Sequence, residues 1–232
     1  DPGYLESSYL GMGSMLCAPL SVEGRVVGVL VMESDVAYAF TSEDLHLIEA
    51  LTPYITTIIE VAQLHRKARL EAIYDSLTGV YNHRYFYERL REELARSRRY
   101  GFPLSMVILD IDGMKRVNDI YGHLAGDQAL GIIGRILKQN TRASDIVARY
   151  GGDEFTIIML ETEKERALEF IRRVTDILDK TTIYYHGVAF PMPSRSYGVV
   201  TFPHDGSDAV ELFAAADHLL YEAKERGRGV AR

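Results

Sequence analysis

Residues 146–160, IVARYGGDEFTIIML, contain the pattern that decides the fold of this 232-residue chain. Two glycines and two carboxylates, Gly151-Gly152-Asp153-Glu154, stand between two runs of apolar and β-branched residues. This pattern predicts a tight β-hairpin with paired acids at its tip, because glycine accepts the positive φ of a turn and lets a bulky ligand approach the main chain. We therefore expect strands at 146–150 and 155–160.

Helix and strand patterns alternate on both sides of this hairpin. Apolar periodicity predicts helices at 85–99, 125–140, 164–178 and 209–226, and further strands at 104–111 and 196–201. Strands interleaved with helices indicate an α/β or α+β domain, in which helices cover a central sheet.

A second acidic pair, Asp110 and Asp112, closes the predicted strand at 104–111. Strand alternation would place both side chains on one face, unless the strand has already ended. Carboxylates from two neighbouring strands, without a cluster of Cys or His, favour hard Mg²⁺ or Mn²⁺, which usually serve substrate phosphates. The alternative interpretation is a plain hairpin with solvated acids and an Asp that caps the next helix.

Groups suited to nucleotide recognition follow this pair. An amide and a carboxylate together can complement the donor-rich edge of guanine, and a lysine can meet phosphate. Lys224 and Arg228 lie about one helical turn apart near the C-terminus, although such a pair is more often an ordinary solvated helix end. The candidates after Asp112 are Lys115, Asn118, Asp119, His123, Gly126 and Asp127.

The first third of the chain has a different surface. Residues 1–74 carry a net charge of −6 and residues 75–232 a net charge of −1, so we place a domain boundary near residue 75. The total of −7 argues against the basic surface of a protein that binds nucleic acid polymers.

The segment before this boundary predicts a hairpin and a long helix. The runs 15–22 and 25–33 flank Glu23-Gly24, and an N-cap pattern at 41–44 begins a helix that reaches about Tyr74. Near-heptad spacing along this helix could serve packing within one domain or a dimer seam. The residues concerned are Leu51, Tyr54, Ile58, Val61, Ala68 and Ala72.

Two features bear on location. The single Cys17 cannot form an internal disulfide and fits a reducing, cytoplasmic setting. The longest apolar stretch, 26–32, is far shorter than the roughly 20 residues of a membrane-spanning helix. We expect no membrane segment in this chain, and an anchor in a longer parent chain stays open.

Four segments, in order and spacing, resemble the GGDEF domain of the diguanylate cyclase family. They are DSLTGVYNHRYF (75–86), LDIDGMKRVNDIYGHLAGD (109–127), RYGGDEF (149–155) and ADHLLYEAKERGRG (216–229). The resemblance implies a mostly antiparallel central sheet flanked by helices, as in nucleotidyl cyclases. It also implies condensation of two GTP into cyclic di-GMP with release of two pyrophosphates, by a homodimer in which each domain holds one GTP.

The resemblance also implies site residues. Asp110, Asp153, Glu154 and the Ile111 carbonyl would hold Mg²⁺ or Mn²⁺, two ions per active site. The implied catalytic residues are Asp153, Glu154 and Lys224. The implied GTP contacts are Lys115, Asn118, His123, Asp127, Gly151, Gly152, Lys224 and Arg228.

Five residues separate the segment Arg142-Ala143-Ser144-Asp145 from Gly151. Its RxxD spacing resembles that of the family's product-binding inhibitory site. The alternative is an ordinary surface pair. Gly113 and Met114 depart from the family's usual residues, as does His83, which replaces a frequent arginine. These departures affect the expected affinity more than the expected activity.

Residues 1–60 resemble the C-terminal part of a GAF domain, a sensory and dimerising module, through MLCAPLSVEGRVVGVLVME and AFTSEDLHLIEALTPYITTII. We expect a helical linker at 61–74 and the GGDEF domain at 75–232. The leading hypothesis is a product-inhibited diguanylate cyclase that the N-terminal module regulates. The alternative is a non-catalytic GGDEF module that binds GTP or cyclic di-GMP as a signalling receptor.

Overall fold

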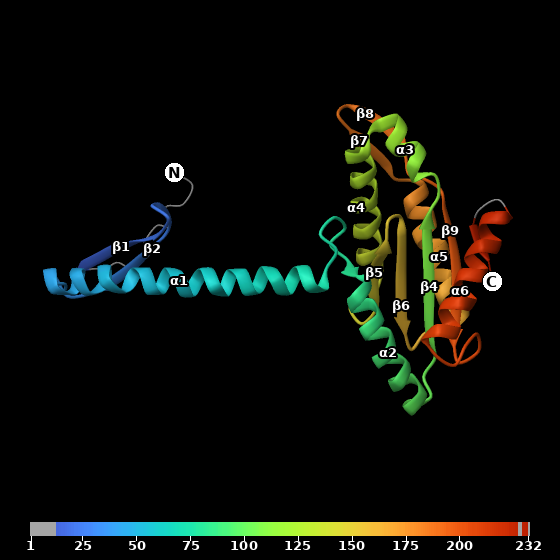
Figure 1. Cartoon of the computed structure of the whole chain (residues 1–232), viewed down its shortest axis with the longest axis horizontal. Helices are drawn as coiled ribbons and strands as arrows, with labels where there is room; N and C mark the ends of the chain where they lie inside the picture. The colour runs from blue at the N-terminus through green and yellow to red at the C-terminus, as the bar shows by residue number, and fades with distance from the viewer. Residues whose placement is uncertain (1–12, 227–228, 232) are drawn as a thin grey trace. The chain divides into compact units, whose positions relative to one another are not determined.

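The computed structural model describes residues 13–226 and 229–231 (Figure 1). The chain divides into two compact units, one that ends at Arg69 and one that begins at Leu70. The smaller unit consists of a β-hairpin and most of a long helix, and the larger unit contains the remaining elements.

The hairpin of the smaller unit pairs β1 (Ser14–Val22) with β2 (Arg25–Ser34) in antiparallel register. Glu23 and Gly24 form the turn with φ of 47° and 80°, which confirms the predicted turn. The hairpin leads to the helix α1 (Ser42–Ile73), whose start is capped reciprocally by Thr41 and Asp44. The Asp44 backbone donates to Thr41 Oγ1 over 3.3 Å, and the Thr41 backbone donates to Asp44 Oδ2 over 2.8 Å.

Helix α1 has two different faces. Thr52 and Thr56 are buried on one face. The other face leaves large apolar side chains exposed by 41–71%, and their spacing alternates between three and four residues. These residues are Leu47, Leu51, Tyr54, Ile58 and Val61.

The length and composition of α1 also meet the minimum for a membrane-spanning helix, with a mean hydropathy of 1.2 over its best window. It is the one helix of the described residues that does so. Helices of water-soluble domains pass the same test, so this observation is weak evidence for a span.

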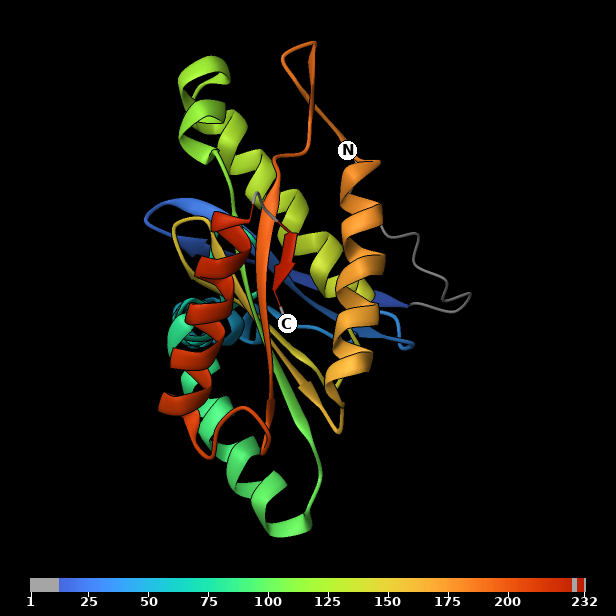
Figure 2. The same cartoon turned by 90° about the vertical axis from the view of Figure 1, so that its right-hand side faces the viewer.

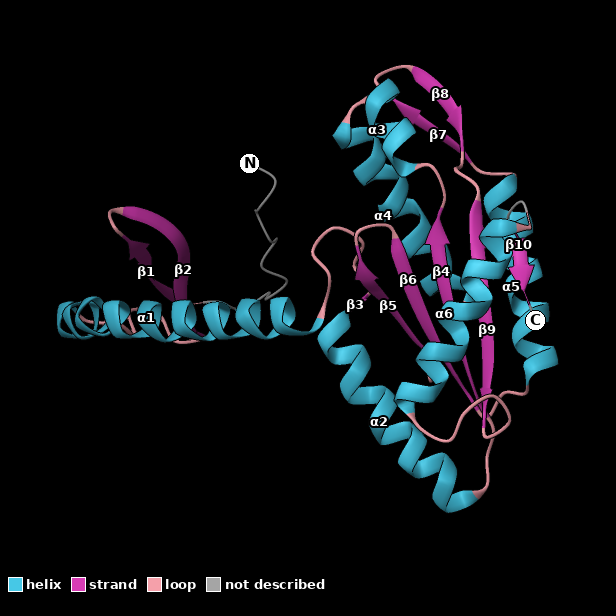
Figure 3. Cartoon of the chain, turned by 45° about the vertical axis from the view of Figure 1, so that its right-hand side comes forward, coloured by secondary structure: helices cyan, strands magenta, loops and turns pink. Residues whose placement is uncertain are grey.

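The larger unit is built on a six-stranded mixed sheet in the order β10-β9-β4-β6-β5-β3 (Figure 3). The four central strands pair antiparallel, and the two edge strands join in parallel. The sheet and its flanking helices confirm the predicted fold class. The strands are β3 (Tyr81–Asn82), β4 (Leu104–Ile111), β5 (Ile146–Gly151), β6 (Glu154–Leu160), β9 (Arg195–Phe202) and β10 (Gly229–Ala231).

Helices cover both faces of this sheet (Figure 2). On one face, α2 (His83–Tyr100) and α6 (Ala209–Glu225) pack over the β4 side chains Met106 and Ile108. On the other face, α4 (His123–Asn140) and α5 (Lys164–Asp179) pack over Val107 and Leu109. The alternation of β4 therefore assigns even-numbered side chains to the α2–α6 layer.

Several short elements were not predicted from the sequence. They include α3 (Met114–Tyr121), which follows β4, and a separate hairpin of β7 (Thr182–Tyr185) and β8 (Val188–Pro191). The edge strands β3 and β10 contain two and three residues. Elements this short carry too few residues for a hydrophobic period to emerge.

Gly198 of β9 lies very close to the backbone of α6. A Cβ atom at Gly198 would lie 2.1 Å from the Ala216 carbonyl oxygen of α6, whereas one at Gly131 in α4 would lie 3.6 Å from its nearest neighbour, the Leu77 carbonyl oxygen. We expect Gly198→Ala to lower the free energy of unfolding by about 1–3 kcal/mol through overpacking. The control Gly131→Ala should raise it by up to about 1 kcal/mol. Urea unfolding measures both, and a neutral Gly198→Ala would contradict the close packing.

Candidate active site

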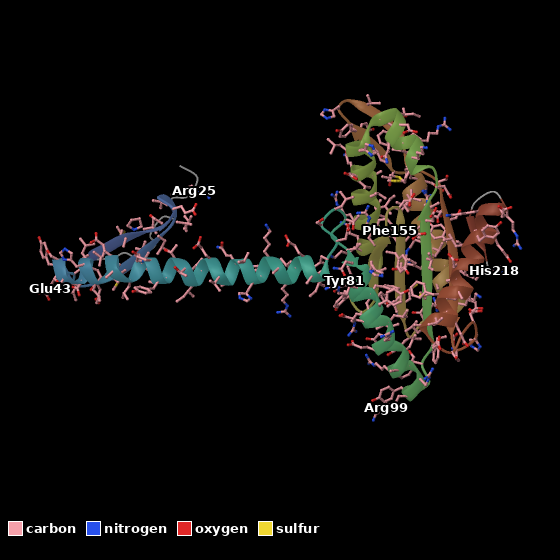
Figure 4. The ribbon with its side chains drawn as sticks, in the orientation of Figure 1. Arg25, Glu43, Tyr81, Arg99, Phe155 and His218 are labelled. Atoms are coloured by element: carbon pink, nitrogen blue, oxygen red, sulfur yellow. The ribbon has the colours of Figure 1, made fainter. Side chains whose placement is uncertain are left out.

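The register of β4 and β6 brings the acids of two distant segments together. Asp110 lies directly opposite Glu154, and the Ile111 backbone donates to the Asp153 carbonyl oxygen over 3.1 Å. Phe155 is fully buried in the α4–α5 layer (Figure 4), so alternation directs Glu154 to the opposite, α6-covered face that Asp110 shares. The predicted pairing of the two acidic motifs at one site is thus present.

The turn itself consists of Gly152 and Asp153, since β5 ends at Gly151 and β6 begins at Glu154. Gly152 has a φ of +53°, a conformation that glycine adopts without strain. Both glycines are exposed, and a Cβ atom added to either would meet no atom of the described residues within 4 Å. The main chain at the hairpin tip is therefore open to a ligand.

A lysine from α6 completes the acidic site. Lys224 Nζ lies 2.8 Å from Asp110 Oδ2, and the Asp110 side chain is 13% exposed. Burial opposes the charged ammonium, but the hydrogen bond to Asp110 and the charges of Asp110, Asp112 and Glu154 together raise the Lys224 pKa above its ordinary value. Lys224 therefore stays charged and fixed at the acidic pair.

The environment of Glu154 disfavours its charged form, whereas that of Lys224 favours it. Burial and the charges of Asp110, Asp153 and Asp217 raise the Glu154 pKa above its ordinary value, against the influence of Lys224. Asp217 lies on α6, two helical turns before Lys224, and its contribution was not predicted from the sequence. The site thus gathers more negative charge than Lys224 neutralises.

These acids suit a hard divalent cation, because their carboxylates offer oxygen ligands. Such an ion would also relieve the repulsion between their negative charges. Within the described residues, however, no group of three or more His, Cys, Asp and Glu side chains is arranged to hold an ion. Asp110 is engaged by Lys224 instead. Binding of an ion would require Lys224 to share or release this carboxylate.

The predicted guanine readers lie on α3 and α4. Asn118 Oδ1 is buried and has no hydrogen-bond partner among the described residues. It occupies the space beside Gly126, where a Cβ atom would lie only 2.0 Å away. Asp127 follows on α4 and is half-buried. An unsatisfied buried amide oxygen costs free energy, so a ligand N–H group that donates a hydrogen bond to it would bind favourably.

Lys115 in the first turn of α3 and His123 at the start of α4 are both exposed. Met114, one of the departures from the family pattern, is buried next to Gly126. Arg228 lies outside the described residues.

Arg149 connects the hairpin to the start of the larger unit. Its Nη2 and Nε donate to the Gly152 carbonyl oxygen over 2.7 and 2.9 Å, and its Nη1 lies 3.3 Å from the Asp75 carboxylate. Asp75 in turn accepts from the Thr78 backbone and hydroxyl. No role for Asp75 or Arg149 was predicted, because 74 residues separate them and no local spacing signals the pair.

Arg142 and Asp145 share a turn that precedes β5. Asp145 is buried, and its two oxygens accept from the Arg142 and Leu160 backbones over 3.0 and 3.3 Å. Burial raises the Asp145 pKa despite these bonds. The Arg142 side chain is exposed beside a cleft of about 340 Å³ that Tyr74, Tyr81 and Lys138 also line. Asp145 thus shapes the turn that presents Arg142.

Comparison with known proteins identifies the class to which this arrangement belongs. Residues 72–230 match the family "Diguanylate cyclase, GGDEF domain", and residues 2–61 match the GAF domain family. The chain therefore belongs to the GGDEF domain family of diguanylate cyclases, and both predicted resemblances are confirmed.

Relatives and a solved structure agree with this assignment. The chain is 38% identical over 161 residues to diguanylate cyclase DgcP of Pseudomonas aeruginosa, covering 69% of this chain and 24% of that protein. It is 31% identical over 215 residues to diguanylate cyclase A of Treponema denticola, covering 90% of this chain and 57% of that protein. A sensory box/GGDEF family protein from Caulobacter crescentus superposes with a TM-score of 0.62 at 35% identity, over 67% of this chain and 100% of that one. The chain thus spans only part of the length of the two named diguanylate cyclases.

The raised pKa of Glu154 means that its ionised form destabilises the fold. This cost is present above the pKa in the folded state and disappears as the pH falls below the ordinary value of 4.5, where the carboxyl is protonated in both states. In EDTA, Glu154→Gln should therefore raise the urea midpoint at pH 7.5 and lose this advantage near pH 4. The exposed control Glu225→Gln should leave the urea midpoint unchanged at both pH values. If the higher midpoint of Glu154→Gln persisted at pH 4, the electrostatic cause would be contradicted.

Proposed function

We propose that this chain is an active diguanylate cyclase. The observation that carries the proposal is the placement of Asp110 directly opposite Glu154, beside the Gly152-Asp153 turn and within 2.8 Å of Lys224. In each half-reaction, the ribose 3′-oxygen of one GTP bonds to the α-phosphorus of the other, and the bond between the α- and β-phosphates breaks. Two such steps release two pyrophosphates and close cyclic di-GMP.

The acidic site would act on the phosphates and on the attacking hydroxyl. Asp110, Asp153, Glu154 and the Ile111 carbonyl are the proposed holders of Mg²⁺ or Mn²⁺, two ions per site, and such ions neutralise phosphate charge and acidify a hydroxyl. Asp153 receives the proton of the 3′-hydroxyl. Lys224 neutralises the charge that develops on the transferred phosphate, with Arg228 as its proposed partner.

Substrate recognition is assigned to the α3–α4 segment and the hairpin tip. The unsatisfied Asn118 Oδ1 and the nearby Asp127 carboxylate supply acceptors for the N–H groups of guanine. Lys115 contacts phosphate, His123 lines the substrate site, and the open backbone of Gly151 and Gly152 allows close approach.

Two chains are required, because each domain supplies one GTP. The exposed heptad face of α1 supports a homodimer, since a second copy of this helix would cover its apolar side chains. We assign residues 1–60 to the GAF-related sensory module, 61–74 to a helical linker and 75–232 to the cyclase domain. Because GTP is the substrate, the proposed location is the cytoplasm.

The direct test of this function is incubation of the dimeric protein with GTP and Mg²⁺, followed by chromatography for cyclic di-GMP. We expect product from the wild type and a loss of at least about 100-fold in turnover for Asp153→Asn, because the variant removes one charge from the site. GTP affinity should remain. The exposed Asp176→Asn serves as the control. Bound but intact GTP with confirmed dimers would instead favour a non-catalytic nucleotide receptor.

Product inhibition is proposed to act through Arg142, whose exposed guanidinium can fork onto a phosphate or a guanine edge, with Asp145 holding the turn. Arg142→Ala should raise the cyclic di-GMP concentration needed for half-inhibition by about tenfold or more, because the variant loses a hydrogen bond to a charged group. Its turnover without product should equal that of the wild type. Inhibition that is unchanged in the variant would remove this role.

A further inference from the structure

A cleft of about 790 Å³ lies on the α2 side of the hairpin tip. Its wall includes Gly151 and Gly152, but none of the acidic residues Asp110, Asp153 and Glu154, and none of the predicted guanine readers. Its volume is within the range of roughly 300–1,000 Å³ that small-molecule sites occupy. The proposed reaction at the acidic site leaves this cleft without a role.

Two exposed arginines line the cleft. Arg84 and Arg91 lie seven residues apart on α2, so they project from one face of the helix, and both are exposed. Among the ion pairs and hydrogen bonds of the described residues, neither guanidinium has a carboxylate partner. The third arginine of the cleft, Arg149, is already bound to Asp75 and Gly152. Arg84 and Arg91 are therefore available to an anion.

An aromatic wall stands beside these cations. The His83 ring packs edge-on against Tyr87 and Tyr150, with centroids 5.3 and 5.2 Å apart. The two tyrosine hydroxyls lie 3.1 Å from each other, and Tyr87 stacks on Phe213 of α6. Each ring is thus held by at least two neighbours, which makes the wall rigid before any ligand arrives.

The start of α2 adds to the positive potential of the cleft. Asn82 caps the helix through the Tyr85 backbone, and the N-terminal end of this 18-residue helix carries a partial positive charge. Glu71 and Glu88 also line the cleft, so its chemistry is mixed. A carboxylate between two guanidiniums suits a ligand that has both phosphate groups and N–H donors.

We propose that this cleft binds the phosphate groups of a guanine nucleotide other than the one that the chain's own α3–α4 segment reads. Arg84 and Arg91 contact the phosphates, and the open backbone of Gly151 and Gly152 lets them approach the hairpin. The nucleotide comes either from solution or from the opposing copy of the chain. The choice of a guanine nucleotide rests on the proposed function, whereas the phosphate chemistry rests on the cleft.

The experiment compares the full chain with Arg84→Ala/Arg91→Ala and with the exposed control Arg172→Ala. GTP is titrated calorimetrically in EDTA, and turnover is measured separately with Mg²⁺. Loss of two charged contacts should weaken nucleotide binding at the cleft by at least about tenfold. The urea midpoints of all three proteins should agree, because the substituted side chains are exposed.

The outcomes separate the two sources of the nucleotide. A stoichiometry that falls from two GTP per chain to one in the double variant supports a nucleotide from solution. A stoichiometry of one in both proteins, with turnover at least tenfold lower in the variant, supports the nucleotide of the opposing copy. Unchanged affinity, stoichiometry and turnover would overturn the proposal. The titration needs no product, so an inactive wild type whose stoichiometry still falls from two to one in the double variant would refute the cyclase alone. An inactive wild type with one GTP per chain and equal affinity in both proteins would overturn the proposal as well.

Discussion

The register between β4 and β6 is the constraint on which the candidate site depends. It sets Asp110 opposite Glu154 on the face that α6 covers, while Leu109 and Phe155 are buried on the other face. Because side chains alternate with a period of two, a slip of one residue would turn the acids toward the apolar layer under α4 and α5, and would turn Leu109 and Phe155 toward α6. The same apolar packing that stabilises the sheet therefore positions the carboxylates.

The acids gathered by this register do not stabilise one another. Glu154 faces Asp110, Asp153 and Asp217, and Lys224 offsets only part of their repulsion. A protein tolerates such a concentration of like charge where a ligand of opposite charge completes the site. The amide oxygen of Asn118, buried without a hydrogen-bond partner among the described residues, also lowers the stability of the fold.

Strand β5 connects features that the chain separates. The turn of Arg142 and Asp145 immediately precedes β5, and the hairpin tip follows it. Arg149, near its end, binds both the Gly152 carbonyl and Asp75 at the start of the larger unit. A change in the conformation of residues 70–75 thus has a direct physical route, through one guanidinium, to the backbone of the hairpin tip.

The sequence by itself determined the β-hairpin, the long helices, the central strands and the two acidic motifs, because glycine turns and apolar periods act over a few residues. The family pattern likewise identified Lys224 and Asn118 as site residues. Only the tertiary structure decided that Lys224 engages Asp110, that Asp217 adds to the charge around Glu154, and that Arg149 binds Asp75. It also turned the Asp145 carboxylate toward the backbone and opened the cleft beside Arg84 and Arg91. These relations join residues from distant segments, and their energies depend on distance and burial, which exist only once the sheet and its helices have packed.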